Sequence, residues 1–235
     1  MSGDLEELLS FLSLRSRLDL KSTALDYVLG LTGSEDGKAL IKSNPEVLKL
    51  LFELTTDEQP VIARDANLVL LNLSSSLEVA DVMLDLSCVS RLLVLLVNPN
   101  YVSADAVCMT LSNLTRSEKG SEAFIAALTH SEHAQTAQQS SAMSASASNA
   151  TLTVPTLYQL VDIFDRKGYN KNANFHYLAT VFSNITQVSV ARQLFLDRKK
   201  CIVPRLIPYT QFYDSEIRRG GVVGLFRNLC FEVGQ

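Results

Sequence analysis

The chain has 235 residues, which is enough for one large domain or two small ones. Hydrophobic residues make up 47% of it, and it contains no Trp, only 10 Gly and only 6 Pro. This composition excludes wholesale disorder and favours helices over a β-sandwich, whose many turns need more Gly and Pro. The net charge of −4 argues against a nucleic-acid-binding protein, which usually carries a basic surface.

The first segment, MSGDLEELLSFL, is acidic where a secretory signal would be basic. The chain also has no uninterrupted apolar run of about 18 residues, the length that a membrane-spanning helix needs. We therefore expect a cytoplasmic location and no membrane partner. The cysteines lie far apart in apolar contexts, which predicts reduced thiols in the protein core; they are Cys88, Cys108, Cys201 and Cys230.

A repeated phrase follows along the chain, consisting of two turns of apolar helix and then x-N-[LI]-[STC]. The first copy, LDYVLGLTGSEDGKALI, has Gly30 where later copies have Asn72, Asn113, Asn184 and Asn228. The intervals between these five positions are 42, 41, 71 and 44 residues. Three of the four intervals agree with the ~40–47-residue period of armadillo and HEAT repeats.

Helix signals accompany each repeat. Prolines stand where helices should begin, at Pro45, Pro60, Pro99 and Pro155. Apolar residues in the longer segments have helical spacing, as in Ala66, Val69, Leu70 and Leu73, and in Val107, Leu111 and Leu114. The sequence thus predicts an all-α protein, a right-handed armadillo/HEAT-like α-solenoid of about five repeats that forms a single domain over residues 1–235.

The long interval of 71 residues contains about 30 residues more than one period. Residues 130–153, HSEHAQTAQQSSAMSASASNATLT, are rich in Ser, Ala and Gln and have almost no large apolar side chains. Such a segment buries too little surface to offset its ordering entropy. We therefore predict a disordered low-complexity insert at residues 130–153, within the solenoid.

The recurring asparagine has two interpretations. In the first, its amide bonds to the same or a neighbouring repeat, so that the asparagines form a structural ladder. In the second, the amides line a concave groove and clamp the main chain of an extended peptide. Both interpretations concern Asn72, Asn113, Asn184 and Asn228.

Charge is unevenly distributed along the chain. Residues 1–129 hold ten Lys and Arg against eighteen Asp and Glu, a net charge of −8, whereas residues 155–235 hold eleven against six, a net charge of +5. One explanation is solvated helix faces, and the other is two surfaces that meet different partners. In the basic half, Arg218 and Arg219 follow Asp214 and Glu216, so they either form local ion pairs or belong, with Arg192 and nearby basic residues, to a rim for an acidic partner.

Signals of catalysis are sparse. His130 and His133 have a spacing that some metal sites use, but no cysteine or second pair lies nearby, and His176 has apolar neighbours. The glycines at 220, 221 and 224 resemble a phosphate loop, yet no strand precedes them; small residues there would let helices approach, with Gly220 and Gly221 opening a turn. We predict no catalytic residue, no metal site and no cofactor.

Several stretches resemble known families. MTLSNLT and its echoes resemble the third-helix signature of armadillo repeats, although the tryptophan beside the asparagine is missing. SEIRRGGVVGLFRNLCFE and NFHYLATVFSNITQ are similar to the signature of the Hgh-type family, also called brain protein sixteen-like. The similarity extends over essentially the whole chain and is most specific in residues 170–230.

The resemblance implies a cytosolic armadillo-like solenoid that binds newly made translation elongation factor two and links it to the cytosolic ring chaperonin. Family members usually continue well beyond this signature, so a truncated or alternative product with an exposed apolar stacking face is one expectation for a chain that ends at Gln235.

Two functions follow as hypotheses. The first is a non-enzymatic adaptor for the folding of elongation factor two, and the alternative is a generic armadillo scaffold that binds an extended peptide. The partner-binding residues expected are the four asparagines with Arg192, Arg218 and Arg219. An enzyme would instead require a pocket in which His176 meets a carboxylate and a nucleophile.

Overall fold

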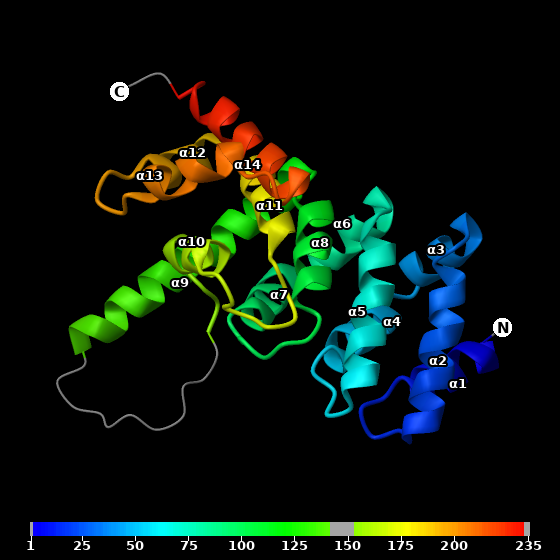
Figure 1. Cartoon of the computed structure of the whole chain (residues 1–235). Helices are drawn as coiled ribbons and strands as arrows, with labels where there is room; N and C mark the ends of the chain where they lie inside the picture. Colours follow the sequence, from blue (N-terminus) through cyan, green and yellow to red (C-terminus); the bar gives the residue numbers. More distant parts are fainter. Residues whose placement is uncertain (1, 142–152, 233–235) are drawn as a thin grey trace. The chain divides into compact units, whose positions relative to one another are not determined.

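The computed structural model describes residues 2–141 and 153–232, and all regular elements in these ranges are helical (Figure 1). This part of the chain contains fourteen α-helices, one 3₁₀ segment and no strand. The predicted all-α class is thereby confirmed, and the arrangement of helices is consistent with an α-solenoid. Contacts within the chain divide it into two compact units, Met1–Cys88 and Val89–Gln235, so the predicted single domain, the repeat number and the handedness stay predictions.

The first unit is built from six helices. In chain order they are α1 (Ser2–Phe11), α2 (Leu18–Leu31), α3 (Glu35–Lys42), α4 (Pro45–Leu54), α5 (Pro60–Ser74) and α6 (Leu77–Asp85). Helix α5 packs against both α2 and α4, and α3 packs against α6. Pro45 and Pro60 occupy the first helical turn of α4 and α5, as predicted, because a proline there forfeits no intrahelical hydrogen bond.

The second unit begins with helix α7, whose first residue, Cys88, lies at the boundary between the units. Its elements are α7 (Cys88–Leu96), α8 (Ala104–Leu114), α9 (Glu118–Ser141), α10 (Leu157–Asp165), α11 (His176–Ile185), α12 (Ser189–Leu196), α13 (Ile202–Leu206), η1 (Ile207–Gln211) and α14 (Glu216–Leu229). Pro99 and Pro155 lie a few residues before α8 and α10 rather than at their first positions. A capping box between Thr156 and Gln159 starts α10 instead.

The helices that carry the repeated phrase stack on one another within each unit. Helix α2 packs against α5 in the first unit, and α11 packs against both α8 and α14 in the second. Glycines permit the closest approach: a Cβ on Gly221 would lie 2.4 Å from the carbonyl carbon of Ala179, and one on Gly224 would lie 2.4 Å from the Ser183 Oγ. The predicted role of small residues is confirmed, but the predicted turn at Gly220 and Gly221 is wrong, because both lie inside α14.

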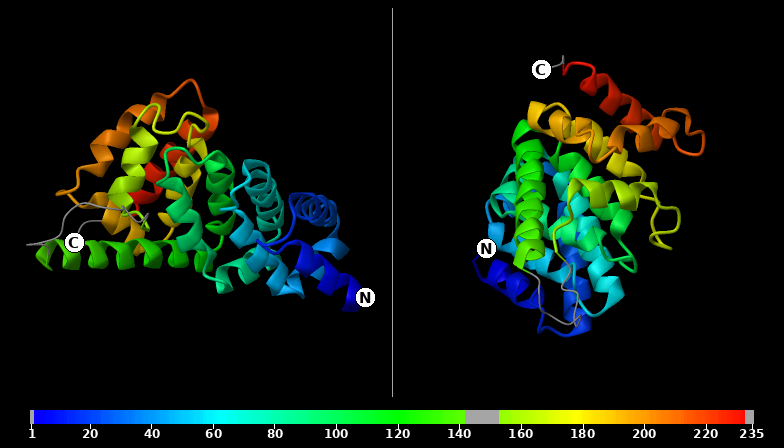
Figure 2. Two further views of the ribbon diagram at one scale, coloured as in Figure 1. Left: turned by 90° about the horizontal axis from the view of Figure 1, so that it is seen from below. Right: turned by 90° about the vertical axis from the view of Figure 1, so that its left-hand side faces the viewer.

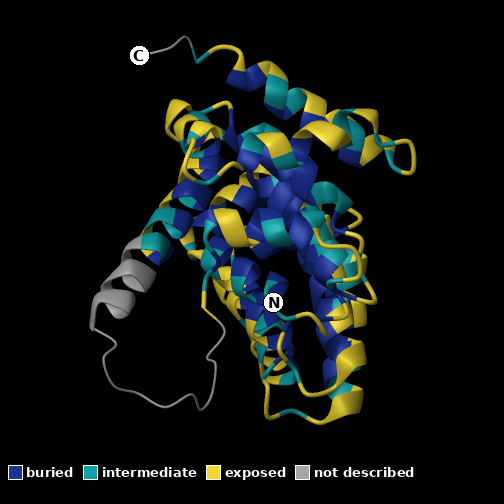
Figure 3. Cartoon of the chain, turned by 60° about the vertical axis from the view of Figure 1, so that its left-hand side comes forward, coloured by how far each residue is buried: buried dark blue, intermediate teal, exposed yellow. Residues whose placement is uncertain are grey.

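Buried residues gather on the sides of the helices that face one another within a unit (dark blue in Figure 3). The two apolar stripes read from the sequence are among them, and all their members are at most 1% exposed. They are Ala66, Val69, Leu70 and Leu73 on α5, and Val107, Leu111 and Leu114 on α8. Helical periodicity alone therefore identified the core faces of these two helices.

Helix α9 is the longest element, with 24 residues, and Figure 2 shows it as one continuous helix. It enters the segment 130–153 that the sequence predicts to be a disordered insert, and its last residue is Ser141. Residues 142–152 lie outside the described residues. Disorder in the insert therefore stays a prediction, whereas its first residues continue the helix.

The cysteines divide into two kinds, and no disulfide joins them in the described residues. Cys88 and Cys108 are buried, as predicted, and burial raises the pKa of the Cys108 thiol well above its ordinary value, with Asp105 adding to the effect. Cys201 and Cys230 are exposed, so the prediction of core thiols is wrong for them. Cys201 lies at the N-terminal cap of α13 and Cys230 at the C-terminal cap of α14, where the chain turns outward.

Candidate functional site

The recurring asparagines form hydrogen bonds between neighbouring repeats. The Asn184 Nδ2 donates to the Ser112 carbonyl at 3.0 Å and to the Thr115 Oγ1 at 3.2 Å. One repeat later, the Asn228 Nδ2 donates in the same way to the Ser183 carbonyl at 2.9 Å and to the Thr186 Oγ1 at 3.2 Å. In both rungs the acceptor hydroxyl lies two residues after the position of the preceding asparagine.

The first unit contains a rung of the same kind. The Asn72 Nδ2 donates to the Thr32 Oγ1 at 3.1 Å, and Thr32 lies two residues after Gly30. Asn72 is exposed and Asn113 is half-buried, whereas Asn228 is 9% exposed. The ladder is therefore present at Asn72, Asn184 and Asn228. The peptide clamp stays a prediction, and a bound peptide would compete with these contacts for the same amide nitrogens.

The predicted basic rim is distributed over separate internal contacts. Arg192 binds Glu232 through its Nε at 2.6 Å and donates to the carbonyl of Thr186 at 3.1 Å. This pairing, together with a hydrogen bond from Ser189, lowers the pKa of Glu232. Two basic residues near Arg192 in the sequence also form ion pairs within the unit, Lys200 with Glu132 and Arg205 with Asp162.

Arg218 and Arg219 differ from one another in their surroundings. Arg219 is half-buried, lies 3.7 Å from Glu216 and donates to the Phe212 carbonyl, so the local ion pair is found for this residue. Arg218 is only 7% exposed. Its Nη2 donates to the carbonyls of Phe164 at 2.6 Å and Asn174 at 3.3 Å. These two residues precede Arg218 by 54 and 44 positions in the sequence.

Three aromatic rings surround the Arg218 guanidinium. Its central carbon lies 4.1 Å from the ring centroid of Phe164, 4.8 Å from that of Tyr209 and 5.3 Å from that of Phe212. Contacts of this kind attract a cation through the negative faces of the rings. Burial nevertheless lowers the pKa of Arg218 from its ordinary value, because the charged form loses hydration.

A cleft of about 280 Å³ opens beside Arg218. The loop between α10 and α11 supplies most of its lining residues, and Phe212, Asp214 and Arg218 also line it. The loop supplies both basic and polar lining residues, namely Arg166, Lys167, Gly168, Tyr169, Ala173, Asn174 and Phe175. Helix α11 adds His176, and α10 adds Ile163 and Phe164.

Hydrogen bonds to the α7–α8 region hold this loop in place. The Tyr169 hydroxyl donates to the Val97 carbonyl at 2.6 Å, and the Asn170 Nδ2 donates to the Tyr101 carbonyl at 2.8 Å. The Asp105 carboxylate accepts from two successive backbone amides, including that of Phe175 at 2.8 Å. Phe175 has a left-handed backbone with φ of 56°, which is uncommon for a bulky residue. The hydrogen bonds to Val97, Tyr101 and Asp105 hold the loop in this conformation.

His176 lies at the rim of the cleft with its Nδ1 buried and without a hydrogen-bond partner. Desolvation lowers the pKa of the imidazole, and the positive charge of Arg218 lowers it further. Both effects favour the neutral imidazole over the charged form. Nearby, burial and the hydrogen bond to Asp165 raise the pKa of Tyr209 to about 12, so this hydroxyl stays protonated and donates.

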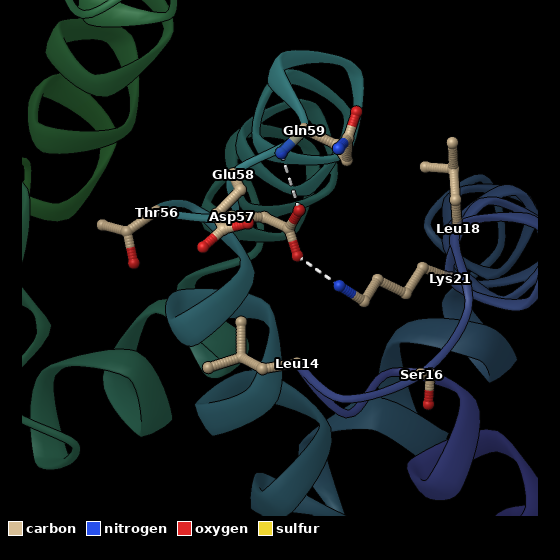
Figure 4. Close-up of a pocket in the computed structure, with 8 residues that line it drawn as sticks. All are labelled: Leu14, Ser16, Leu18, Lys21, Thr56, Asp57, Glu58 and Gln59. Carbon is tan, nitrogen blue, oxygen red and sulfur yellow. Dashed lines mark hydrogen bonds and ion pairs between the residues drawn. The ribbon is translucent and has the colours of Figure 1, made fainter.

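The first unit contains a second buried cation in a different setting. Lys21 on α2 reaches Asp57, which follows α4, and the two charged atoms are 2.6 Å apart (Figure 4). The side chains of Lys21 and Asp57 are 8% and 4% exposed. The other carboxylate oxygen of Asp57 accepts from the Gln59 backbone amide at 2.9 Å. This ion pair lines a cleft of about 470 Å³, which Leu14 and Leu18 also line.

The sequence analysis did not predict that Lys21 and Arg218 are buried, although the sequence contains a signal for it. Lys21 precedes the buried Ala24, Leu25 and Val28 at helical spacing, and Arg218 stands in the same relation to Gly221, Val222 and Leu225. A basic residue in register with an apolar stripe lies on the buried face of its helix. That register identifies both residues, but it does not identify their partners.

The structure also bears on the metal and membrane signals of the sequence. Among residues 5–132 and 153–232, whose side chains the structure describes, no three His, Cys, Asp or Glu residues cluster as metal ligands would. Over the same ranges no single helix has both the length and the apolar character to cross a membrane; α5 and α6 meet both criteria only together, across a bend of 119°.

Residues 95–235 match the family described as "Domain of unknown function (DUF383)". The curated relatives named "Protein HGH1 homolog" share 39% identity with this chain in Danio rerio, 36% in Homo sapiens and 36% in Drosophila melanogaster, each over at least 97% of the chain. This chain belongs to the HGH1 family. It covers 55%, 54% and 58% of those three relatives, so it spans little more than half of their length.

A solved structure shares the fold of this HGH1-family chain. The crystal structure of an engineered protein superposes with a TM-score of 0.54 over 96% of this chain and 98% of its own, at 17% sequence identity. At that identity the similarity concerns the fold alone.

Proposed function

We propose that this HGH1-family chain is a non-enzymatic protein-binding adaptor in the cytoplasm, which assists the folding of translation elongation factor two together with the cytosolic chaperonin. Family membership is the observation that carries the proposal, because the role is the one that the Hgh-type resemblance implies. Its partners are then proteins, with no nucleic acid or membrane required.

The arrangement of helices supports a binding role. Helices α8, α11 and α14 stack in sequence, and the rungs of Asn184 and Asn228 fix each helix to the preceding one. Stacked repeats of this kind present extended surfaces that bind other proteins without large rearrangement. An adaptor for a folding client needs such a preformed surface, since a rigid surface loses little entropy on binding.

Purified components test the proposal. We expect the chain, immobilised through an N-terminal tag, to retain purified elongation factor two and, in the presence of that factor, to retain chaperonin subunits. A version extended to the length of the relatives serves as the comparison, because this chain spans little more than half of them. If neither version retains the elongation factor or the chaperonin above an untagged control, the proposed function is wrong.

A further inference from the structure

The Arg218 guanidinium is a buried cation without a paired anion in the described residues. Arg218 is 7% exposed, and no carboxylate of the described ranges lies within ion-pair distance of it. Its Nε is buried and has no hydrogen-bond partner. Burying a charge without a counter-charge costs free energy, so an anion that binds beside Arg218 would be stabilised.

The nearest carboxylates are already engaged elsewhere. Asp165 accepts from the Tyr209 hydroxyl at 2.7 Å and pairs with Arg205 at 3.3 Å. Asp105 accepts from the backbone amides of Asn174 and Phe175, which anchor the α10–α11 loop. Both carboxylates act on Arg218 only through space, and neither can approach it without giving up those contacts.

The cleft beside Arg218 has the charge and the walls of an anion site. Its lining includes three basic residues, Arg166, Lys167 and Arg218, against one acidic residue, Asp214, in the described part of the chain. The Phe212 side chain also lines the cleft, and apolar surface beside an anion lowers the local dielectric and strengthens the attraction to nearby cations. The backbone contacts of Tyr169, Asn170 and the loop amides hold this geometry before any ligand arrives.

We propose that this cleft binds a carboxylate group of a protein partner, with Arg218 as its principal charge partner and Lys167 as a rim contact. A planar carboxylate matches a planar guanidinium, which offers several N–H donors in one plane. Asp214, which also lines the cleft, reduces the attraction of the site for a dianion such as phosphate, because it repels each negative charge of the ligand. The inference rests on the proposed function only in placing the carboxylate on a protein.

Nuclear magnetic resonance with defined probes tests the site directly. The chain, labelled with ¹⁵N, is titrated with N-acetyl-glutamate N-methylamide, which carries a side-chain carboxylate, and with N-acetyl-alanine, which carries a C-terminal carboxylate. We expect saturable shifts of the Arg218 Nε–H and of the backbone amides of residues 166–176 with at least one probe, and the stronger probe identifies the source. The neutral isostere, N-acetyl-glutamine N-methylamide, is expected to cause no saturable shift.

Matched variants locate the effect. Arg218→Met is expected to weaken probe binding at least tenfold, whereas Arg227→Met, which removes the same charge from an exposed position of α14, should change it less than twofold. Lys167→Gln at the exposed rim should weaken binding about two- to fivefold and remains informative if Arg218→Met does not fold.

Three results would overturn the site: no saturable shift with either carboxylate, equal binding by the neutral isostere, or a stronger response to inorganic phosphate. Unchanged affinity in a folded Arg218→Met variant would do the same. The outcome is separable from the adaptor role, since retention of elongation factor two by the unmodified chain is measured independently. Probe binding when neither the chain nor its extended version retains the elongation factor or the chaperonin overturns the proposed function alone, and retention without probe binding overturns the site alone.

Discussion

In the described residues, each of the two units buries one cation near the first turn of a helix, but the surroundings of the two cations differ. In the first unit Lys21 meets Asp57 at 2.6 Å, and both side chains are less than one-tenth exposed. In the second unit Arg218 is equally buried but is held by two carbonyls and three aromatic rings. In an ion pair the positive charge is neutralised by its partner. A cation that contacts only neutral groups is not neutralised and can still attract an anion. The comparison therefore separates a structural charge from a charge suited to recognition.

Removing the paired cation should have the largest effect. Lys21→Met leaves Asp57 buried without its counter-ion, and we expect a loss of about 3–5 kcal/mol in the free energy of unfolding. Urea denaturation with hydrogen exchange followed in α2 measures it. The control is Lys49→Met, which breaks an exposed pair with Glu46 and should cost at most about 1 kcal/mol. Equal losses in both variants would contradict the structural role of the buried pair.

Removing the unpaired cation should cost less. Arg218→Met loses two hydrogen bonds to carbonyls but leaves no carboxylate without a partner, so we expect a loss of about 1–3 kcal/mol. The same denaturation experiment, with hydrogen exchange followed in α14, gives the value. A loss as large as that of Lys21→Met would mean that Arg218 serves the fold as much as Lys21 does, and the distinction between the two units would fail.

The close contact between α11 and α14 sets the position of Arg218 and can be tested with a pair of glycines. Gly221→Ala places a methyl group 2.4 Å from the backbone of Ala179, so we expect a loss of about 1–3 kcal/mol. Gly220→Ala has no atom within 4 Å of the added carbon and should stabilise the helix by about 0.4–1 kcal/mol. Thermal unfolding followed by circular dichroism compares them, and a shift in the same direction for both would contradict the described packing.

The asparagine rungs provide a smaller contrast between the units. Asn228 is buried and donates to two acceptors, so Asn228→Ala is expected to cost about 1–2 kcal/mol. Asn72 is exposed and donates to one acceptor, and Asn72→Ala should cost less than about 1 kcal/mol. Urea denaturation of the two variants, each against the parent chain, measures the difference. The reverse order would show that exposure does not determine the strength of a rung.

The smallest effect concerns pH. The pKa of His176 in the folded chain lies below its ordinary value of 6.5, so the unfolded chain binds the proton more readily in the interval between the two values. Stability should therefore fall as the pH decreases through that interval, and His176→Gln should remove this part of the pH dependence. Denaturation of both proteins between pH 5 and 8 (roughly the range in which histidine titrates) provides the measurement. Parallel stability curves would contradict the lowered pKa.

The fold was accessible from the sequence because it depends on a period. The spacing of Asn72, Asn113, Asn184 and Asn228 and the apolar stripes before them predict stacked helices without knowledge of any long-range contact. The ladder partners were also within reach, since the hydroxyls of Thr115 and Thr186 belong to the same repeated phrase. Local rules and repetition were sufficient for these features.

The candidate site was not accessible in the same way. The carbonyl partners of Arg218 lie 44 and 54 residues away, and Asp57 lies 36 residues from Lys21. The sequence left open a local ion pair of Arg218 or a place in a basic rim, whereas in the structure its guanidinium binds the carbonyls of Phe164 and Asn174. The same limit explains the cysteines: apolar neighbours in sequence did not show that Cys201 and Cys230 stand at helix caps facing solvent.

The rung between Asn184 and Ser112 joins residues that are 72 positions apart, although comparable rungs span 40 and 45 positions. The hydrogen bond depends on the two helices being adjacent, and the number of residues that connect them has no direct influence on it. A longer connection costs only slowly growing loop entropy. This fold can consequently gain chain length between α8 and α11 while every rung keeps its register, which makes that connection a natural place for an added tether or an entire guest domain.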